Sequence, residues 1–236
     1  MLEDRDNLCR SGRLVSRGSV TTLLIALNVA VFVIQNLVEH LDSFPVYSSF
    51  ALSVDGLKHG RLWQFLTFQF LHLPLSQGGM FHLMGNLFLI HLVGHPVEKA
   101  LGPSGFLKLY LLGGTFGGLL QMIGGLFSPG QFGLSVVGAS AGTFGLIAAF
   151  ATLFPHRLVN LFFLPVAIRA DVLLSLGVAA TLAGLFLPSG HVAHCAHLGG
   201  ILTGFILARQ FLSESRAPAF VKLGPTSALK TTPKPD

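Results

Sequence analysis

The feature that most constrains this sequence is a series of apolar segments, each long enough to cross a lipid bilayer as a helix. A transmembrane helix needs about 20 consecutive, predominantly apolar residues. Charged residues make up only 11% of the chain, against about 25% in soluble domains, so a water-exposed surface is hard to build. We therefore predict an all-α, polytopic bundle of transmembrane helices. The six predicted helices cover residues 19–38, 80–97, 105–127, 134–154, 169–188 and 193–212.

The basic residues orient these helices, because cytoplasmic loops are enriched in Lys and Arg. If the N-terminus is cytoplasmic, only Lys58 and Arg61 of the 15 basic residues lie on the outer side. We therefore predict an integral, multi-pass protein in a lipid bilayer, with both termini in the cytoplasm. The N-terminus lacks a short apolar core with a cleavage site, so no removable signal peptide is expected.

The predicted membrane core covers residues 19–212. A cytoplasmic segment, 1–18, precedes it, and the Pro-containing tail 213–236 is predicted to be cytoplasmic and disordered. The long outer segment 39–79 is rich in apolar and aromatic residues, and we expect it to lie in the membrane interface. Residues 155–168 are apolar, but Pro155 and Pro165 bracket most of them. We therefore predict that they form a connection or a re-entrant turn.

The net charge of +5 does not indicate a nucleic-acid partner. Such binding needs Lys and Arg clustered on one face, whereas here they are scattered between apolar blocks. The only cysteines are Cys9 and Cys195, so a disulfide framework is not expected.

Four polar residues fall inside predicted membrane helices, where polar groups are costly and indicate function. His82 and Asn86 are four residues apart and share one face of the second helix. Ser140 lies in a run of small residues that opens the fourth helix, and His197 lies early in the sixth. All three helices run from outside to inside in this topology. The four side chains are therefore predicted at similar depth near the outer surface, where they can converge.

Glycines explain how these helices can approach closely. Small residues at four-residue spacing let membrane helices pack backbone to backbone, and Gly200 and Gly204 provide this spacing below His197. Gly138, Gly142 and Gly145 give a similar surface around the serine. Such contact is expected to bring the Ser140 hydroxyl within hydrogen-bonding reach of His197, as a nucleophile and its base require.

These motifs together resemble the rhomboid family of intramembrane serine proteases, and the resemblance covers about residues 19–212. The motifs keep the family's order along the chain. They are His82-Leu83-Met84-Gly85-Asn86, Val97-Glu98-Lys99 ahead of Gly102, Gly138-Ala139-Ser140 followed by Gly145, and Ala196-His197 followed by Gly200 and Gly204.

The resemblance implies a Ser–His dyad without a third acid, in which Ser140 is the nucleophile and His197 the base. It also implies that His82, Asn86 and the backbone N–H of Ser140 stabilise the oxyanion, and that no metal or cofactor takes part. The implied substrates are single-span membrane proteins cut near the outer membrane face. The compact six-helix form resembles the simple prokaryotic members, which implies a bacterial inner membrane.

Three features depart from the usual family pattern. The residue after Ser140 is Ala141 rather than glycine, and the common Trp-Arg pair of the outer loop is Trp63-Gln64. Residues 74–79 read as an insertion before His82, which can change how substrates enter.

Other functions are less compatible with the sequence. A metal site at His191, His194 and His197 is conceivable, but three-residue steps rotate around a helix and His191 falls in a predicted loop. Gly138–Gly142 also fits a G-x-S-x-G elbow with Asp171 as third member, but the surrounding blocks are too apolar for a soluble hydrolase. An inactive, client-binding rhomboid-like protein stays open as the main alternative, and a small-solute transporter is less favoured because no internal repeat is visible.

Overall fold

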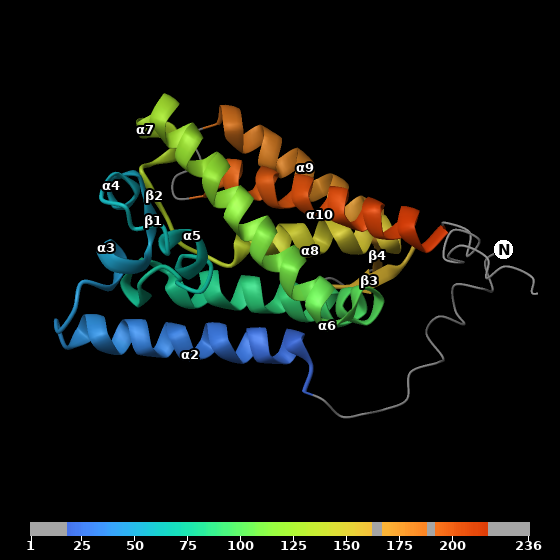
Figure 1. Cartoon of the computed structure of the whole chain (residues 1–236), viewed down its shortest axis with the longest axis horizontal. Helices are drawn as coiled ribbons and strands as arrows, with labels where there is room; N and C mark the ends of the chain where they lie inside the picture. The colour runs from blue at the N-terminus through green and yellow to red at the C-terminus, as the bar shows by residue number, and fades with distance from the viewer. Residues whose placement is uncertain (1–17, 162–166, 188–191, 217–236) are drawn as a thin grey trace, which may run out of the picture.

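The computed structural model describes residues 18–161, 167–187 and 192–216. The predicted disordered tail 213–236 is wrong at its start, because residues 213–216 continue the last helix. The rest of that tail, most of the predicted N-terminal segment, Pro165 and His191 lie outside these ranges. The longer helices run along the long axis of the molecule or at a slant to it (Figure 1). The helices are α2 (Val20–His40), α3 (Val46–Phe50), α4 (Val54–Lys58), α5 (Gln64–Thr67), the 3-10 turn η1 (Leu75–Gln77), α6 (Gly79–Phe127), α7 (Pro129–Phe132), α8 (Ser140–Leu153), α9 (Ala170–Phe186) and α10 (His194–Arg216).

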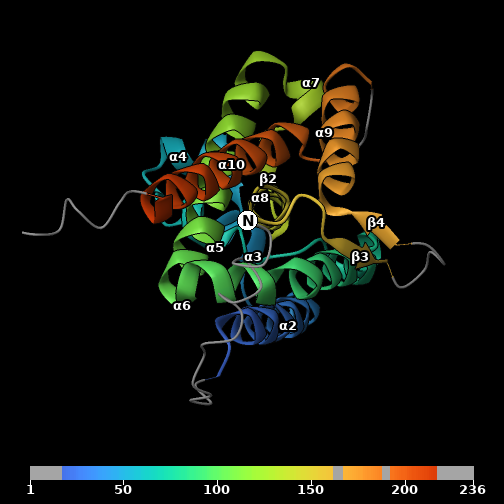
Figure 2. The ribbon, with the colours of Figure 1, turned by 90° about the vertical axis from the view of Figure 1, so that its right-hand side faces the viewer.

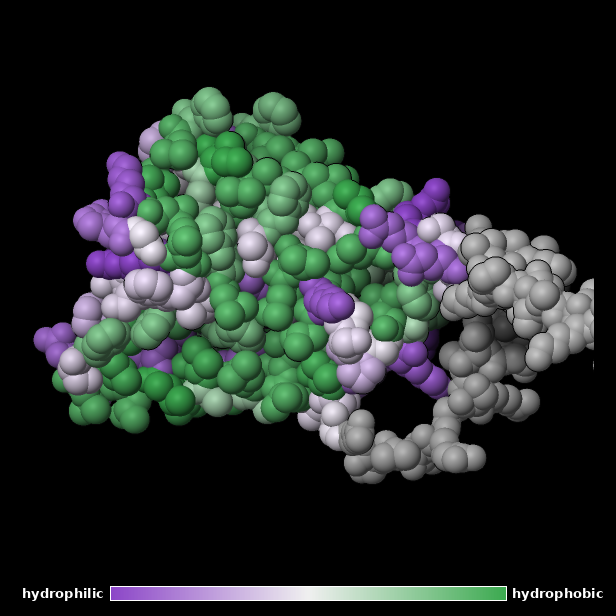
Figure 3. Space-filling model, in the orientation of Figure 1, coloured by the Kyte–Doolittle hydropathy of each residue, from purple (hydrophilic) through white to green (hydrophobic). Residues whose placement is uncertain are grey.

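Three of these helices, α2, α6 and α10, are long and apolar enough to cross a membrane, and α8 and α9 are shorter apolar helices. Apolar residues cover a broad band of the surface, and polar residues gather mostly near the two ends of the long axis (Figure 3). This pattern matches a bilayer, where apolar surface faces lipid and polar surface faces water. The chain is therefore a helical membrane protein, as its composition predicts.

The predicted second and third helices form one element in the structure. α6 continues through the predicted connection and is interrupted only at Gly102, whose φ of 73° and ψ of 166° are not helical. Pro103 follows directly, and proline suits the first position of a new helical stretch. Residues 79–101 and 103–127 are therefore two helical halves that turn at one glycine, and the loop expected between them is shorter than predicted.

The predicted start of the fourth helix is wrong. Ser135–Val136 forms strand β2, which pairs antiparallel with β1 (Leu52–Ser53) of the outer loop, and helix α8 begins only at Ser140. Gly138 separates strand from helix with a φ of 131°, a conformation that side chains with a Cβ rarely adopt. The chain thus enters α8 from an extended segment fixed by the outer loop.

Two short strands, β3 (Leu158–Asn160) and β4 (Ala167–Arg169), pair antiparallel between α8 and α9. They fit the connecting turn predicted there. We call the end of the molecule that carries β3 and β4 the hairpin end, and the end that carries α3, α4, α5, β1 and β2 the loop end (Figure 1).

Helix α8 is the centre of the bundle. Eleven of its 14 residues are buried, and it packs against both α6 and α10. Figure 2 shows α2 on the outside of the bundle, next to α6. Glu98 of α6 joins these two helices, because its carboxylate accepts hydrogen bonds from the backbone N–H groups of Val20 and Thr21 at 2.7 and 2.9 Å. It thereby satisfies amide groups that every helix start leaves free.

Candidate active site

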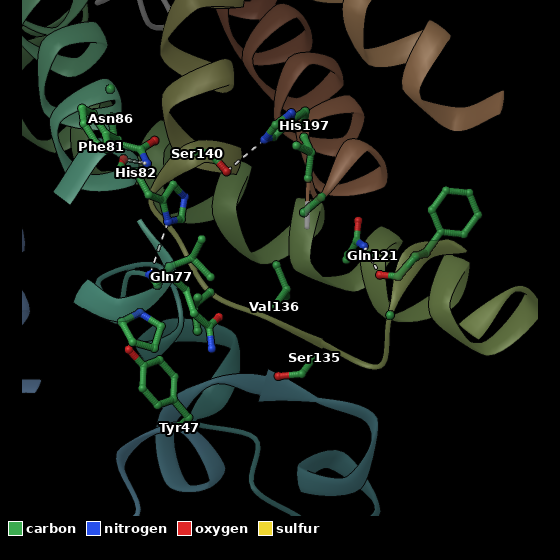
Figure 4. A pocket seen from close by; sticks show the side chains of 18 of the residues that line it. Tyr47, Gln77, Phe81, His82, Asn86, Gln121, Ser135, Val136, Ser140 and His197 are labelled. Atoms are coloured by element: carbon green, nitrogen blue, oxygen red, sulfur yellow. Dashed lines mark hydrogen bonds between the residues drawn. The ribbon is translucent and has the colours of Figure 1, made fainter. Parts of the chain in front are cut away.

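Ser140 and His197 meet in the half of the bundle nearer the loop end. The Oγ atom of Ser140 lies 3.0 Å from Nε2 of His197 (Figure 4). Ser140 is the first residue of α8, and His197 lies in the first turn of α10. A serine hydroxyl hydrogen-bonded to an imidazole is the arrangement that nucleophilic catalysis requires.

Glycines at the contact of α8 and α10 set the distance between these two residues. A Cβ atom at Gly200 would lie 2.0 Å from the carbonyl oxygen of Ala141, and one at Gly204 would lie 2.0 Å from that of Gly145. Neither position has room for a side chain, so the two backbones touch. The structure therefore places Gly200, Gly204 and Gly145 in one interface.

The other two predicted glycines have different neighbours. A Cβ atom at Gly142 would lie 2.7 Å from the ring of Tyr110, so this glycine admits α6 rather than α10. A Cβ atom at Gly138 would lie 2.9 Å from Cε1 and Nε2 of His82. Gly138 is thus the point where the imidazole of His82 approaches the segment leading to Ser140.

Two aromatic rings hold the imidazole of His197. Phe144 stacks on it with ring centroids 4.2 Å apart and an interplanar angle of 17°. His194 approaches its edge at 6.0 Å. The sequence interpretation missed Phe144, although it follows Ser140 by four residues and so shares its helix face. The stack fixes the plane of the imidazole that faces the serine.

His82 presents a hydrogen-bond donor to the site. The backbone N–H of Leu73 donates to Nδ1 of His82 at 3.4 Å. In a neutral imidazole one nitrogen accepts and the other carries the proton. Because Nδ1 accepts, Nε2 carries the proton, and Nε2 is the atom that lies next to Gly138.

Asn86 lies one turn beyond His82 and is 5% exposed. Its Nδ2 donates to the backbone carbonyl of His82 at 2.9 Å, which fixes the orientation of the amide. An amide NH₂ has two donors, so a second N–H is available for another acceptor. His82, Asn86, Ser140 and His197 all line one cavity.

This cavity measures about 850 Å³, within the range typical of ligand pockets. Polar residues line it on several sides, from Ser140 and His197 to Tyr47, Gln77 and Gln121, and apolar residues make up much of the remaining wall (Figure 4). The apolar lining includes Phe81, Leu89, Val136, Phe144 and Val192. The site thus combines polar groups on several sides with apolar surface that suits the side chains of an apolar peptide segment.

Gln121 holds the start of α10 and was not predicted from the sequence. Its Oε1 accepts a hydrogen bond from the N–H of Ala196 at 3.1 Å, and its Nε2 donates to the carbonyl of Phe132 at 2.7 Å. Ala196 precedes His197, so this buried amide anchors the turn that carries the imidazole. Its long separation in sequence from Ala196 explains why no local pattern indicates it.

The structure accommodates each departure from the usual family pattern. Ala141 is 1% exposed and faces Gly117, where a Cβ atom would lie only 2.7 Å from its methyl group. Gln64 is buried and ties the outer loop together, because it accepts from the N–H of Ser53 and donates to the carbonyl of Ser48. Residues 74–79 form η1 and the start of α6.

Two titratable groups of the outer loop are strongly affected by burial. Burial, together with the neighbouring His82, lowers the pKa of His72 to about 3. Its ring nitrogens have no hydrogen-bond partner among the described residues, and the ring contacts that of His82 edge-on at 5.1 Å. Burial also raises the pKa of Tyr47, and the nearby carboxylate of Glu39 adds to the effect.

Asp171 is the second residue of α9, directly after strand β4 of the hairpin end, and it pairs with Arg169. Of the three histidines considered for a metal, His191 lies outside the described residues, so that question stays a prediction.

Comparison with known proteins identifies the family. A Rhomboid domain model matches residues 59–214. Rhomboid protein 1, mitochondrial, of Saccharomyces cerevisiae is 33% identical over 135 residues, which cover 56% of this chain and 38% of that protein. RHOMBOID-like protein 1 of Arabidopsis thaliana is 34% identical over 163 residues, covering 69% and 38% of the two chains. Presenilin-associated rhomboid-like protein, mitochondrial, of Homo sapiens is 29% identical over 130 residues, covering 55% and 34%.

The chain therefore spans between 34% and 38% of the length of these three relatives. The family model, by contrast, covers more than half of the chain. The resemblance stated from the sequence motifs is confirmed, and the chain belongs to the rhomboid family.

Proposed function

We propose that this protein is an intramembrane serine endopeptidase. The observation that carries the proposal is the 3.0 Å hydrogen bond between Ser140 Oγ and His197 Nε2, in a helical membrane protein of the rhomboid family. Rhomboid-like proteins that only bind clients need no such pair, so its presence favours catalysis.

The chemistry is acyl transfer. The Ser140 oxygen attacks the scissile carbonyl carbon while His197 Nε2 takes the hydroxyl proton. His197 then gives this proton to the leaving amine as the peptide bond breaks, which leaves an acyl ester on Ser140. Water, deprotonated by the same imidazole, hydrolyses the ester and restores the serine. In these steps the imidazole of His197 acts first as a general base and then as a general acid.

Negative charge on the attacked oxygen needs preorganised donors. His82 offers Nε2–H next to Gly138, and Asn86 offers its second amide N–H. The N–H of Ser140 is a third donor. The hydrogen bond from the N–H of Thr143 to the carbonyl of Ala139 is the first of helix α8, so the N–H groups before Thr143 have no partner within the helix. The dipole at the start of α8 adds to these donors.

His197 works in this proposal without a carboxylate. The groups that orient it are the stacked ring of Phe144 and the edge of His194. Asp171 stays with Arg169 at the hairpin end. We therefore propose a dyad in which aromatic packing replaces the orienting role that a carboxylate has in a triad.

We further propose that the 19–212 core crosses the membrane six times, with α6 supplying two crossings on either side of Gly102. An even number leaves both termini on one face, and the basic residues favour the cytoplasm. Helix α8 has 14 residues, or about 21 Å, against a hydrocarbon core of about 30 Å. Its short length supports a Ser140 recessed from the outer surface. The bacterial inner membrane stays a prediction, because the named relatives are eukaryotic.

The proposed substrates are single-span membrane proteins cut near the outer face. The cavity lies toward the loop end, and its apolar wall suits side chains of a transmembrane segment. A helix hides its carbonyl groups in internal hydrogen bonds, so the segment must unwind at the cut site before Ser140 can attack.

Purified protein in detergent should cleave a model single-span substrate, and Ser140→Ala should abolish the cleavage. Ser175→Ala is a matched control. Among the described residues its hydroxyl bonds only the carbonyl of Asp171, which lies in the same helix at the hairpin end. If wild type and Ser140→Ala behave alike, the protease proposal is wrong. Retention of the substrate by both, uncut, would instead support the client-binding alternative.

A further inference from the structure

Gln35 is a buried amide near the loop end of helix α2, and only 2% of it is exposed. Its side chain pairs with both backbone groups of one residue of the outer loop. The N–H of His72 donates to Oε1 at 3.1 Å, and Nε2 donates to the carbonyl of His72 at 2.7 Å. The hydroxyl of Tyr47 also donates to this carbonyl, at 2.9 Å. Three hydrogen bonds, two from Gln35 and one from Tyr47, therefore hold the backbone at His72.

Leu73, the residue after His72, contacts the imidazole of His82. Leu73 donates its N–H to Nδ1 of His82 at 3.4 Å. The backbone of Leu73 has little room to move, because its carbonyl oxygen packs against Gly79. A Cβ atom at Gly79 would lie only 1.9 Å from this oxygen. The segment is thus wedged against the first turn of α6, and its position depends on what holds its other side.

We propose that Gln35 is a positioning residue for His82. By fixing the backbone of His72, it aims the N–H of Leu73 at Nδ1 of His82. The proton of the imidazole is then kept on Nε2, where it serves as the oxyanion donor. The inference rests on the proposed protease function only for its kinetic consequence, since the geometry and the tautomer exist without substrate.

A glutamine is required for chemical reasons. Only a primary amide offers both the acceptor for the N–H and the donor for the carbonyl of His72. A carboxylate at this position would repel the carbonyl, and leucine or methionine would offer neither group. If Gln35 only filled space in a membrane helix, leucine would serve as well or better.

The first experiment is a double-mutant cycle on kcat with a model single-span substrate. Gln35→Leu should lower kcat by roughly ten- to a hundredfold, because a displaced catalytic group has effects of this size, and should leave KM within about twofold. In a His82→Ala background, Gln35→Leu should cause no further fall, because the two residues act as one unit. Gln35→Met, which keeps the chain length, should repeat the result if the leucine variant folds poorly.

Asn36→Ala is the matched control. Asn36 is the next residue of α2, and its Oδ1 accepts from the N–H of Leu75 at 3.1 Å. It therefore holds the same loop two residues beyond Leu73. We expect its kcat within about twofold of wild type, the scale of an exposed hydrogen bond. An equal fall in Asn36→Ala would overturn the proposal, because general loosening of the loop would explain both variants.

The second experiment does not depend on activity. In protein carrying ¹⁵N-labelled histidine, the His82 signals, assigned by their loss in His82→Ala, should show a protonated Nε2 and an unprotonated Nδ1. Gln35→Leu should produce a tautomer mixture at His82, whereas Asn36→Ala should not. An unchanged tautomer in Gln35→Leu, or an equal fall in kcat with and without His82, would overturn the inference. Failure of the wild-type protein to cleave would reject the protease function, but the role of Gln35 in fixing the tautomer of His82 would still be tested by these spectra.

Discussion

The two halves of the candidate site are held in place by different kinds of contact. The half that carries Ser140 and His197 depends on glycines, because the backbones of α8 and α10 touch at Gly200 and Gly204. The half that carries His82 depends on directional hydrogen bonds, which run from Gln35 through the backbone of His72 and Leu73.

This difference predicts different responses to mutation. A contact between backbones has no spare volume, so a single added methyl group must move a helix. A hydrogen-bonded chain can loosen by degrees, and each lost bond changes the orientation of one ring. The first half should therefore fail in both stability and activity, and the second half mainly in activity.

The largest expected effect comes from adding a methyl group between α8 and α10. Gly200→Ala would place a Cβ atom 2.0 Å from the carbonyl of Ala141. Because the helices must separate, we expect the unfolding free energy to fall by about 1–3 kcal/mol. The Ser140–His197 hydrogen bond should be lost, and kcat should fall on the order of a thousandfold. Thermal unfolding in detergent and substrate cleavage measure the two effects.

Gly113→Ala is the control for this prediction. Gly113 lies on α6 at the contact with α8, but a Cβ atom there would be 3.7 Å from its nearest neighbour, an ordinary contact distance. We expect wild-type stability and activity. If Gly113→Ala proves as harmful as Gly200→Ala, the cause is any change in glycine content and not the steric contact.

His82→Ala tests the hydrogen-bonded half. Loss of one oxyanion donor should lower kcat by roughly a hundredfold, while the unfolding free energy falls by no more than about 1 kcal/mol, the scale of one lost hydrogen bond. His91→Ala, an exposed histidine on the same helix, should keep wild-type kcat. A stability loss in His82→Ala as large as that of Gly200→Ala would remove the contrast between the two halves.

A smaller effect is expected at the ring that stacks on His197. Phe144→Leu keeps the apolar volume but removes the flat face 4.2 Å from the imidazole. A stacked pair is worth about 1 kcal/mol, or about fivefold in kcat. Phe144→Tyr keeps the face and should retain wild-type kcat. Equal rates for the leucine and tyrosine variants would show that stacking does not orient His197.

The last prediction concerns the pH dependence of stability rather than catalysis. The pKa of His72 is about 3 in the folded protein, against an ordinary value of 6.5. Below pH 6.5 the unfolded chain takes up a proton that the folded ring does not, so stability should fall as the pH drops from 6.5 toward 3. His72→Phe should show a shallower fall between pH 7.5 and pH 5, approximately the upper part of this window. Parallel curves for the two proteins would contradict this reading.

The sequence allowed different parts of the site to be predicted to different extents. Ser140, His197 and the glycines around them form local patterns, so their residue types and spacing indicated where they should meet. Gln35 and Gln121 act on backbone groups far away in sequence, at His72 and Ala196. No local pattern reports such a bond, and these residues could be found only from the structure.

The boundaries of helices show the same limit. Hydropathy predicted a helix from residue 134, because a strand of apolar residues and a membrane helix have similar composition. The pairing of β2 with Leu52–Ser53 decides the outcome, and it joins segments more than eighty residues apart. The break of α6 at Gly102 was closer to prediction, since glycine followed by proline is a local signal.

The central claim is that Ser140 is a nucleophile activated by His197, and covalent labelling tests it most directly. A fluorophosphonate probe added to the purified, folded protein should form an adduct that mass spectrometry locates on Ser140. His197→Ala should lose the labelling, while His91→Ala should retain it. An adduct on another serine, or labelling that is independent of His197, would contradict the account.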